Sequence, residues 1–262
     1  MMRKSLVYGA FGLMLCGAGM AVAEDSREVL TQISTLDALM SGIYDGQYTV
    51  KDVKQYGDAG IGTFQGLDGE LLMLDGTIYK ISSDGAVSTP EDTALIPYVA
   101  VTFFDVDQEK PLAAGLTLKD FPAAADALLA TPNLFYAIRI EGTFQKMKTR
   151  SVPKQEKPYP PLAEVVKKQS VFEFENVEGV IVGLRCPSFV KGLNAPGYHL
   201  HFLAKDGKAG GHVLDFTVAQ AVIKIDQTAE FSMIIPENQD FYQHQFAEED
   251  SAALQKVLQP PK

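Results

Sequence analysis

Residues 197–212 read GYHLHFLAKDGKAGGH and contain three of the chain's four histidines: His199, His201 and His212. His199 and His201 are two residues apart, so on a β-strand both side chains leave the same face. Asp206-Gly207, between the two arms, is a strong signal for the turn of a β-hairpin. With this pair at the turn centre, His201 lies opposite His212, and His199 lies diagonally from His212 on the same face. The stretch therefore predicts a hairpin on which three imidazoles converge.

Convergent imidazoles are a common way for a protein to bind a transition metal. Three histidines at about 2.0–2.1 Å from Zn²⁺, with other coordination positions left for water or substrate, form the pattern of a catalytic zinc site. The alternative is that surface or core histidines are grouped here by chance. Spacing, alternation and turn agree independently, which favours a metal site on the hairpin.

The first 23 residues have the organisation of a secretory signal peptide. A basic Met1-Met2-Arg3-Lys4 precedes a largely apolar run, and Ala21-Val22-Ala23 is a typical cleavage site. We expect cleavage after Ala23 and a secreted or periplasmic protein. A membrane anchor is less favoured because glycines interrupt the apolar run, and a lipoprotein because no small residue directly precedes Cys16. No other stretch has the roughly 20 apolar residues that span a bilayer.

The mature chain is acidic and has a single cysteine. Loss of the two positive charges of Arg3 and Lys4 changes the formal net charge from −10 to −12. Such a chain is a poor candidate for binding nucleic acid or anionic membranes, and an anionic substrate would need local cations to hold it. Only Cys186 remains after cleavage, which excludes an intrachain disulfide.

Periodicity predicts an α+β fold dominated by sheet, with two mixed or antiparallel β-sheets, a few flanking helices and the metal site on a β-hairpin. Helices are expected over residues 25–40, over 117–129 with Thr117 as the cap, and over 161–168, with a weak helix or tail over 248–258. Consecutive hairpins are expected within residues 64–81. Further strands are expected over 135–149, 171–184, 197–203, 212–224 and 229–235.

A proline-rich segment divides the chain. Four prolines between residues 151 and 162 indicate a crossing loop and not regular structure. The predicted order is a cleaved signal peptide over residues 1–23, an N-terminal α/β sheet region over 24–150, the crossing segment over 151–162, and a C-terminal sheet region with the histidines over 163–262.

Short motifs through most of the mature chain resemble those of the α-acetolactate decarboxylase family. Each is modest alone, but together and in order they are specific. They are STLDAL at 34–39, YDG at 44–46, GDAGIGTF at 57–64, GLDGEL at 66–71, DG at 75–76, RSVPKQ at 150–155, YPPL at 159–162, GYHLHF at 197–202 and GGHVLD at 210–215.

The resemblance implies a homodimeric lyase that converts 2-acetolactate to acetoin and CO₂. It implies Zn²⁺ as the cofactor, with His199, His201 and His212 as ligands and no organic cofactor. The hydroxyl and ketone oxygens of acetolactate can chelate one metal ion. As a Lewis acid, that ion would stabilise the enediolate left when CO₂ departs.

The resemblance also assigns roles to further residues. Glu70 matches an active-site glutamate that would protonate the enediolate, and Arg150 matches an arginine that would hold the substrate carboxylate. Without the resemblance, Glu70 would be interpreted as a solvated hairpin residue and Arg150 as a residue on an exposed strand face. Thr63 matches a substrate-pocket position. For a glutamate that the family has in its C-terminal tail, Glu248 and Glu249 are the candidates.

Two residues outside these motifs are expected to have structural roles. His244 has no partner at metal-ligand spacing and is expected to be a surface or structural histidine. Cys186 is expected to be a small buried side chain and not a nucleophile.

Two other functions remain open from the sequence. A cupin-like metalloenzyme also has an HxH pair on a strand, but cupins place a glutamate a few residues later, and residues 203–206 contain none. A secreted zinc-binding protein without catalysis would explain the histidines, but neither Arg150 nor the run over 66–70. The resemblance therefore favours the lyase, with a small molecule as its binding partner.

Overall fold

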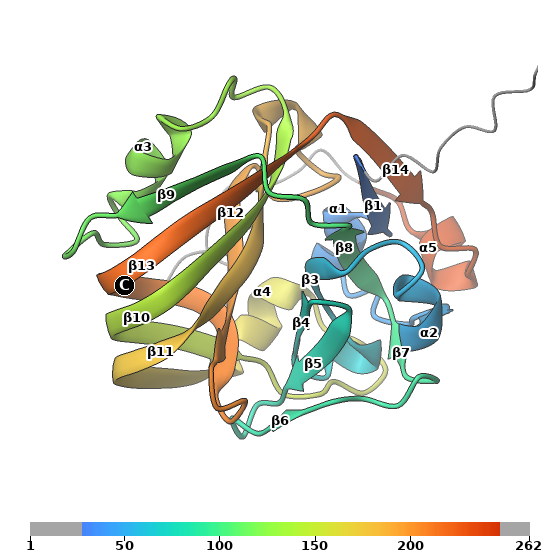
Figure 1. Ribbon diagram of the computed structural model, residues 1–262. Helices are drawn as coiled ribbons and strands as arrows, with labels where there is room; N and C mark the ends of the chain where they lie inside the picture. The colour runs from blue at the N-terminus through green and yellow to red at the C-terminus, as the bar shows by residue number, and fades with distance from the viewer. Residues whose placement is uncertain (1–27, 247–262) are drawn as a thin grey trace, which may run out of the picture.

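The computed structural model describes residues 28–246, in which two large β-sheets pack against each other with short helices at their margins (Figure 1). One sheet has seven strands in the order β14-β1-β8-β3-β4-β5-β6, and the other has five in the order β10-β11-β12-β13-β9. A small third sheet pairs β2 with β7. This architecture confirms the predicted sheet-dominated α+β fold. No helix in this part of the chain is long and apolar enough to cross a membrane.

The seven-stranded sheet is buried on both faces at its centre. Strands β3 and β8 have only buried residues, because one face packs on the second sheet and the other on a separate apolar cluster. Asp75 and Gly76 form a tight turn with positive φ between β4 and β5, which confirms a hairpin there. The strands of this sheet are β1 (Val29–Ile33), β3 (Ala59–Thr63), β4 (Glu70–Leu74), β5 (Thr77–Ile81), β6 (Val87–Ser88), β8 (Tyr98–Thr102) and β14 (Glu230–Ile234).

The helix predicted over residues 25–40 is wrong over residues 29–33, which form strand β1. Four of the five residues of β1 are buried, and the strand pairs with β8 on one side and with β14 on the other. These non-local pairings override the helical spacing of the apolar residues. Ser34, with a φ of 67°, ends the strand, and Thr35 caps the helix that begins at Leu36.

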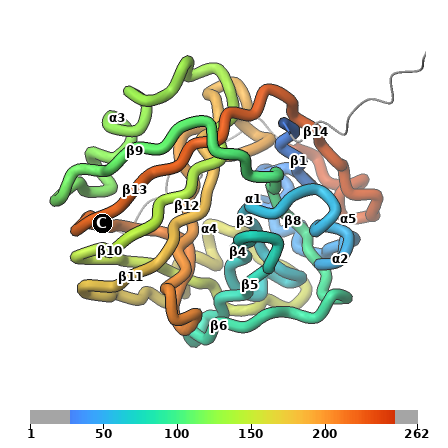
Figure 2. The backbone as a smooth tube through the Cα atoms, viewed as in Figure 1, coloured from blue at the N-terminus to red at the C-terminus, as the bar shows by residue number. Residues whose placement is uncertain are grey.

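The five-stranded sheet closes on itself. Strand β10 pairs with β11 along one edge and with β13 along the other, so the long strands curl around a core of their own (Figure 2). Gly142 of β10 allows the close approach, because a Cβ there would lie 2.1 Å from the carbonyl oxygen of Gln220. The strands are β9 (Gln108–Leu112), β10 (Phe135–Ser151), β11 (Ser170–Cys186), β12 (Gly197–Ala204) and β13 (Gly210–Thr228). Strands β10 to β13 confirm the strands predicted in these regions, whereas β9 was not predicted.

The helices are short and lie at the margins of the sheets. They are α1 (Leu36–Met40), α2 (Val50–Val53), α3 (Phe121–Asp126), α4 (Leu162–Val165) and α5 (Gln239–Gln243), and β2 (Tyr48–Thr49) and β7 (Leu95–Ile96) form the small sheet. The helix predicted over 161–168 is confirmed by α4 and the 3₁₀ turn after it. The helix predicted over 117–129 is shorter, and its cap is Asp120. Thr117 is not the cap because it forms a β-bridge with Thr217.

Both halves of the chain contribute to each sheet. Strand β10 precedes the proline-rich segment but belongs to the five-stranded sheet, whereas β14 near the end belongs to the seven-stranded sheet. The strands of the two sheets therefore do not follow the sequence ranges 24–150 and 163–262. The proposed signal peptide over 1–23 and the tail over 248–258 lie outside the described residues.

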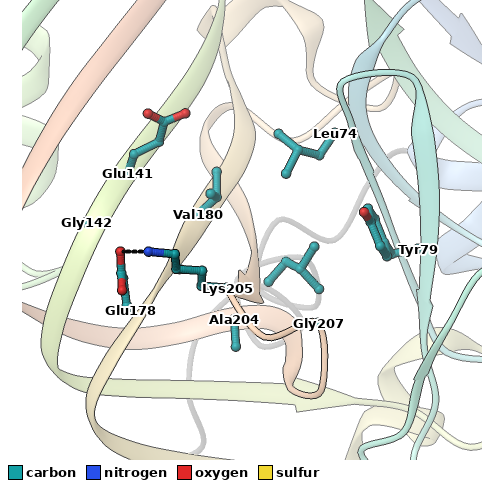
Figure 3. A pocket seen from close by; sticks show the side chains of 11 residues that line it. Leu74, Tyr79, Glu141, Gly142, Glu178, Val180, Ala204, Lys205 and Gly207 are labelled. Atoms are coloured by element: carbon teal, nitrogen blue, oxygen red, sulfur yellow. Dashed lines mark hydrogen bonds and ion pairs between the residues drawn. The ribbon is translucent and has the colours of Figure 1, made fainter.

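A hollow of about 340 Å³ separates the β4–β5 hairpin from the five-stranded sheet (Figure 3). Leu74 and Tyr79 line it on one side, and Val180 lies on the other. An ion pair of 2.7 Å between Lys205 and Glu178 neutralises two of its charges. No histidine is among the residues that line this hollow. It is therefore not a candidate for the predicted metal site, although it is large.

A buried hydrogen-bond network ties β1 to the segment that leads into β12. The side-chain amide of Gln32, which has 0% exposure, donates to the carbonyl oxygens of Leu193 at 2.7 Å and Ser34 at 2.8 Å. Asn194 donates to the Oε1 atom of Gln32 at 2.6 Å. The network thus holds the seven-stranded sheet to the start of the histidine-bearing strand.

Gln32→Leu should lower the free energy of unfolding by about 2 kcal/mol, because it leaves buried carbonyl and amide groups without partners. Urea unfolding of the purified protein measures this change. Gln220→Leu is the matched control: Gln220 is exposed on β13, so its change should stay within about 0.5 kcal/mol. Equal stability losses in the two variants would contradict a stabilising role for the network.

Candidate metal centre

The histidine hairpin forms in the predicted register. His201 of β12 pairs with His212 of β13, followed by Phe202 with Gly211 and Leu203 with Gly210. The turn is closed by a hydrogen bond of 2.9 Å from the amide of Gly207 to the carbonyl oxygen of Ala204, and Gly207 has a φ of 68°. Local sequence therefore fixes which histidines face each other.

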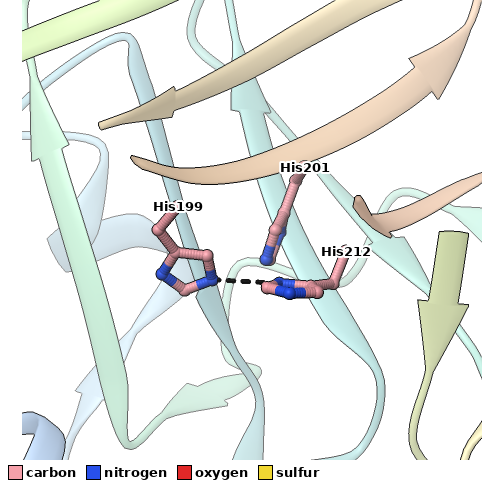
Figure 4. Close-up of side chains that lie close together, drawn as sticks. All are labelled: His199, His201 and His212. Carbon is pink, nitrogen blue, oxygen red and sulfur yellow. Dashed lines mark hydrogen bonds between the residues drawn. The ribbon is translucent and has the colours of Figure 1, made fainter. Parts of the chain in front are cut away.

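The three imidazole rings converge on one point (Figure 4). Ring centroids are 5.1 Å apart for His199 and His201, 4.9 Å for His199 and His212, and 5.4 Å for His201 and His212. Each ring offers a nitrogen atom such that the three nitrogens lie within 4.8 Å of one another. This spacing is compatible with one shared metal ion.

Contact with the other sheet orients the ring of His201. Its Nδ1 atom lies 2.7 Å from the carbonyl oxygen of Leu71 in β4, and because a carbonyl oxygen only accepts, Nδ1 is the donor. The proton is then on Nδ1 and the lone pair on Nε2, which has no hydrogen-bond partner among residues 28–246. A backbone carbonyl that fixes the tautomer in this way is typical of metal-binding histidines.

The cluster favours neutral imidazoles. His201 and His212 are 1% and 2% exposed. Burial, assisted by the positive charge of Arg150, lowers the pKa of His199 to about 3. Burial also holds the pKa of His201 well below its usual value. Neutral imidazole is the form that binds metal, and the buried Nε2 of His201 lacks another partner. These residues therefore fit a divalent metal ion.

Glu70 lies beside the histidines at the start of β4. Its Oε2 atom is 3.6 Å from Nε2 of His201, and the residue is 7% exposed. Burial raises the pKa of the Glu70 carboxyl to about 7, although the nearby positive charge of Arg150 opposes the shift. Protonated and ionised forms of Glu70 are thus both available near neutral pH.

Arg150 and Thr63 approach the histidines from different strands. Arg150 is paired with His212 across β10 and β13, and it is 5% exposed. Its Nε atom has no hydrogen-bond partner in the described part of the chain. Thr63, at the end of β3, donates a hydrogen bond of 2.7 Å to the carbonyl oxygen of Gly69 and so fixes the backbone just before Glu70.

One cavity of about 40 Å³ brings together Thr63, Glu70, Arg150, His199 and His201. Its remaining wall is mostly apolar, and the side chains come from α1, from the proline-rich segment and from β8. Tyr98 of β8 belongs to this wall and was not identified from the sequence, because it lies in a buried strand with no functional motif around it.

The remaining residues discussed from the sequence are not among those that line this cavity. His244, at the end of α5, packs against Phe246 with a ring distance of 4.6 Å, in agreement with a structural role. Cys186 is 1% exposed, and burial raises the pKa of its thiol to about 12, as expected for a small buried side chain. Glu248 and Glu249 lie outside the described residues.

A model of the α-acetolactate decarboxylase family matches residues 30–248. The chain is 45% identical over 236 residues to the α-acetolactate decarboxylase of Methanosarcina mazei, a match that covers 90% of this chain and 82% of the relative. It is 41% identical over 211 residues to that of Bacillus subtilis, covering 80% and 83%.

The fold agrees with this relationship. The crystal structure of α-acetolactate decarboxylase from Bacillus subtilis strain 168 superposes with a TM-score of 0.87 and 38% identity, over 88% of this chain and 100% of that one. The fold and the buried titratable cluster define an enzyme of the carboxy-lyase class. The chain belongs to the α-acetolactate decarboxylase family. Membership of this family argues against both alternatives left open by the sequence, a cupin-like metalloenzyme and a zinc-binding protein without catalysis.

His201→Ala should abolish stoichiometric metal binding, because two imidazoles hold a divalent ion poorly. Metal content of the purified protein after dialysis measures the loss. His244→Ala is the matched control and should keep the wild-type metal content, because His244 lies on α5 away from the cluster. Full metal content in the His201 variant would contradict the assignment of His201 as a ligand.

Proposed function

We propose that the protein decarboxylates 2-acetolactate to acetoin and CO₂ with the help of one Zn²⁺ ion. The observation that carries the proposal is the cavity in which a buried carboxyl, a buried guanidinium and two of the three converging histidines meet. The names of the relatives support acetolactate as the substrate.

His199, His201 and His212 would hold the ion through one ring nitrogen each. Three neutral imidazoles with further positions open for substrate suit zinc in a catalytic site. When bound, the ion would act as a Lewis acid toward the hydroxyl and ketone oxygens of the substrate and stabilise the negative charge that develops as CO₂ leaves.

Arg150 would bind the substrate carboxylate. Its guanidinium is a buried positive charge beside the histidines, because Arg150 is the cross-strand neighbour of His212. Burial strengthens a charge-assisted hydrogen bond because little water competes for the donors. Arg150 would therefore capture an anion despite the acidic charge of the whole chain, and would orient the bond that breaks.

Glu70 would deliver the proton that completes the reaction. Breaking the bond to CO₂ leaves an electron pair on the rest of the substrate. A proton from the Glu70 carboxyl to the carbon that has lost CO₂ then gives acetoin. Glu70 lies within 3.6 Å of His201 through Oε2, and its backbone is fixed by the contact of Thr63 with Gly69. Its protonated form would be restored from water.

The apolar wall of the cavity would exclude water from this chemistry. Leu36, Leu39 and Leu162 line it together with the charged groups. Exclusion of water strengthens electrostatic interactions inside the site.

Export and assembly are also part of the proposal. The basic start, the apolar run and Ala21-Val22-Ala23 support a signal peptide cleaved after Ala23, and hence a secreted or periplasmic enzyme. The family resemblance supports a homodimer. Glu248 or Glu249 would contribute a further carboxylate to the site.

The direct test is turnover by the mature chain. Protein purified with stoichiometric zinc should release CO₂ and acetoin from racemic 2-acetolactate, at a rate proportional to its zinc content, and the His201→Ala variant should be inactive. Zinc binding without turnover would contradict the proposal and favour a non-catalytic zinc protein.

Arg150→Ala should keep its zinc but lose about 10- to 100-fold in kcat/KM, because a hydrogen bond to a charged group contributes about 1.5–3 kcal/mol. Steady-state kinetics and metal content measure the two effects. Arg139→Ala is the matched control on the same strand: Arg139 pairs with Asp75 at the surface, so its loss should leave the kinetics unchanged. Unchanged kinetics in the Arg150 variant would rule out its proposed role.

A further inference from the structure

Tyr98 occupies a defined place in the candidate site. In the antiparallel pairings, Thr63 lies opposite Tyr98 on one side and opposite Glu70 on the other. Directly opposed residues share one face of a sheet, so the three side chains form a row across β8, β3 and β4. All three line the same cavity as His199 and His201. Tyr98 therefore belongs to the side of the cavity formed by the seven-stranded sheet, whereas His199 and His201 belong to the five-stranded sheet.

The hydroxyl of Tyr98 lacks a hydrogen-bond partner among residues 28–246. Tyr98 is 2% exposed, and no hydrogen bond joins its hydroxyl to another residue within 28–246. Tyr44, in the same apolar cluster, shows the usual arrangement: it is 0% exposed and donates a hydrogen bond of 2.9 Å to the carbonyl oxygen of Pro160. A buried phenol normally finds such a partner, because losing water without replacement costs free energy. The partner of Tyr98 is therefore to be sought in the cavity.

The phenol of Tyr98 stays neutral and can therefore donate a hydrogen bond. Burial, with a smaller contribution from nearby Cys186, raises the pKa of its phenol well above the usual value. The group thus stays protonated at any pH at which the protein is folded and active, and its O–H is available to an acceptor.

Two donors that have no hydrogen-bond partner in the described part of the chain line this one cavity. One is the buried Nε atom of Arg150. The other is the hydroxyl of Tyr98, which comes from the other sheet and forms no hydrogen bond with residues 28–246. On the proposed function, the hydroxyl and ketone oxygens of the substrate would be attracted by a cation among the histidines. That leaves the carboxylate, whose two oxygens can accept from two donors at once.

We propose that Tyr98 is a substrate-binding residue whose hydroxyl donates a hydrogen bond to the carboxylate of the bound 2-hydroxy-3-keto acid, together with Arg150. This inference rests on the proposed function and adds a residue that no motif identifies. Tyr98 and Arg150 together would hold the carboxylate between the two sheets and set the direction in which CO₂ leaves.

Tyr98→Phe tests the proposal, because it removes the hydroxyl and keeps the ring. The zinc-loaded mature enzyme should show a rise of about tenfold or more in KM for 2-acetolactate, as expected for one lost hydrogen bond to a charged acceptor. The inhibition constant of 2-hydroxy-2-methylpropanoate, which has the hydroxyl and carboxylate but no ketone, should rise by the same factor. Zinc content should not change.

Two controls separate binding from packing. Tyr44→Phe removes a hydroxyl that donates a hydrogen bond to the carbonyl oxygen of Pro160. It should therefore lower the unfolding midpoint but leave KM and the inhibition constant unchanged. The uncharged amide of the inhibitor should lose clearly less affinity than the acid in Tyr98→Phe, because a hydrogen bond to a neutral carbonyl is about half as strong as one to a carboxylate.

The possible failures are distinguishable. An active wild type with unchanged KM and inhibition constant in Tyr98→Phe would overturn the role of Tyr98 and leave the proposed function intact. Equal sensitivity of the acid and its amide to the substitution would also overturn it, since the carboxylate would not be the acceptor. A zinc-loaded wild type without turnover would overturn the proposed function itself.

Discussion

The hydrogen bond between Nδ1 of His201 and the carbonyl oxygen of Leu71 joins the two sheets at the candidate site. It turns the His201 ring so that Nε2 faces the other histidines. Because Glu70 directly precedes Leu71 in β4, the same contact sets the carboxyl 3.6 Å from that nitrogen. Glu70 and His201 belong to different sheets, and their relative position thus depends on one short interaction supported by the packing between the sheets.

Burial determines the protonation state of the groups that meet there. An apolar environment disfavours charge, so it lowers the pKa of His199 and His201 and raises that of Glu70. Arg150 is the exception, because a guanidinium remains charged in proteins. A single retained positive charge among neutral imidazoles and an easily protonated carboxyl is an arrangement that attracts an anion. A cluster of this kind stabilises the fold poorly and is better explained by function.

Most strands were predictable, and the errors have one cause. Strands β10 and β13 alternate between buried and more exposed residues over part of their length, so periodicity identifies them. Residues 29–33 do not alternate, because β1 is buried on both faces. The apolar residues from Val29 to Met40 recur at three- and four-residue spacing, which also matches a helix. Thr117 was predicted as a helix cap and instead pairs with Thr217, which lies 100 residues away. In both cases a distant partner decided the conformation, and a single sequence does not reveal such partners.

The sequence by itself determined the histidine hairpin, because alternation and the Asp206-Gly207 turn are local and set the register of His201 with His212. Family motifs further identified Glu70, Arg150 and Thr63. Only the tertiary structure decided that these residues line one cavity, that Leu71 orients His201, and that Tyr98 faces the site. These relations join strands far apart in the chain, and they arise from the packing of two sheets, whose free energy comes from burying surface and not from any local pattern.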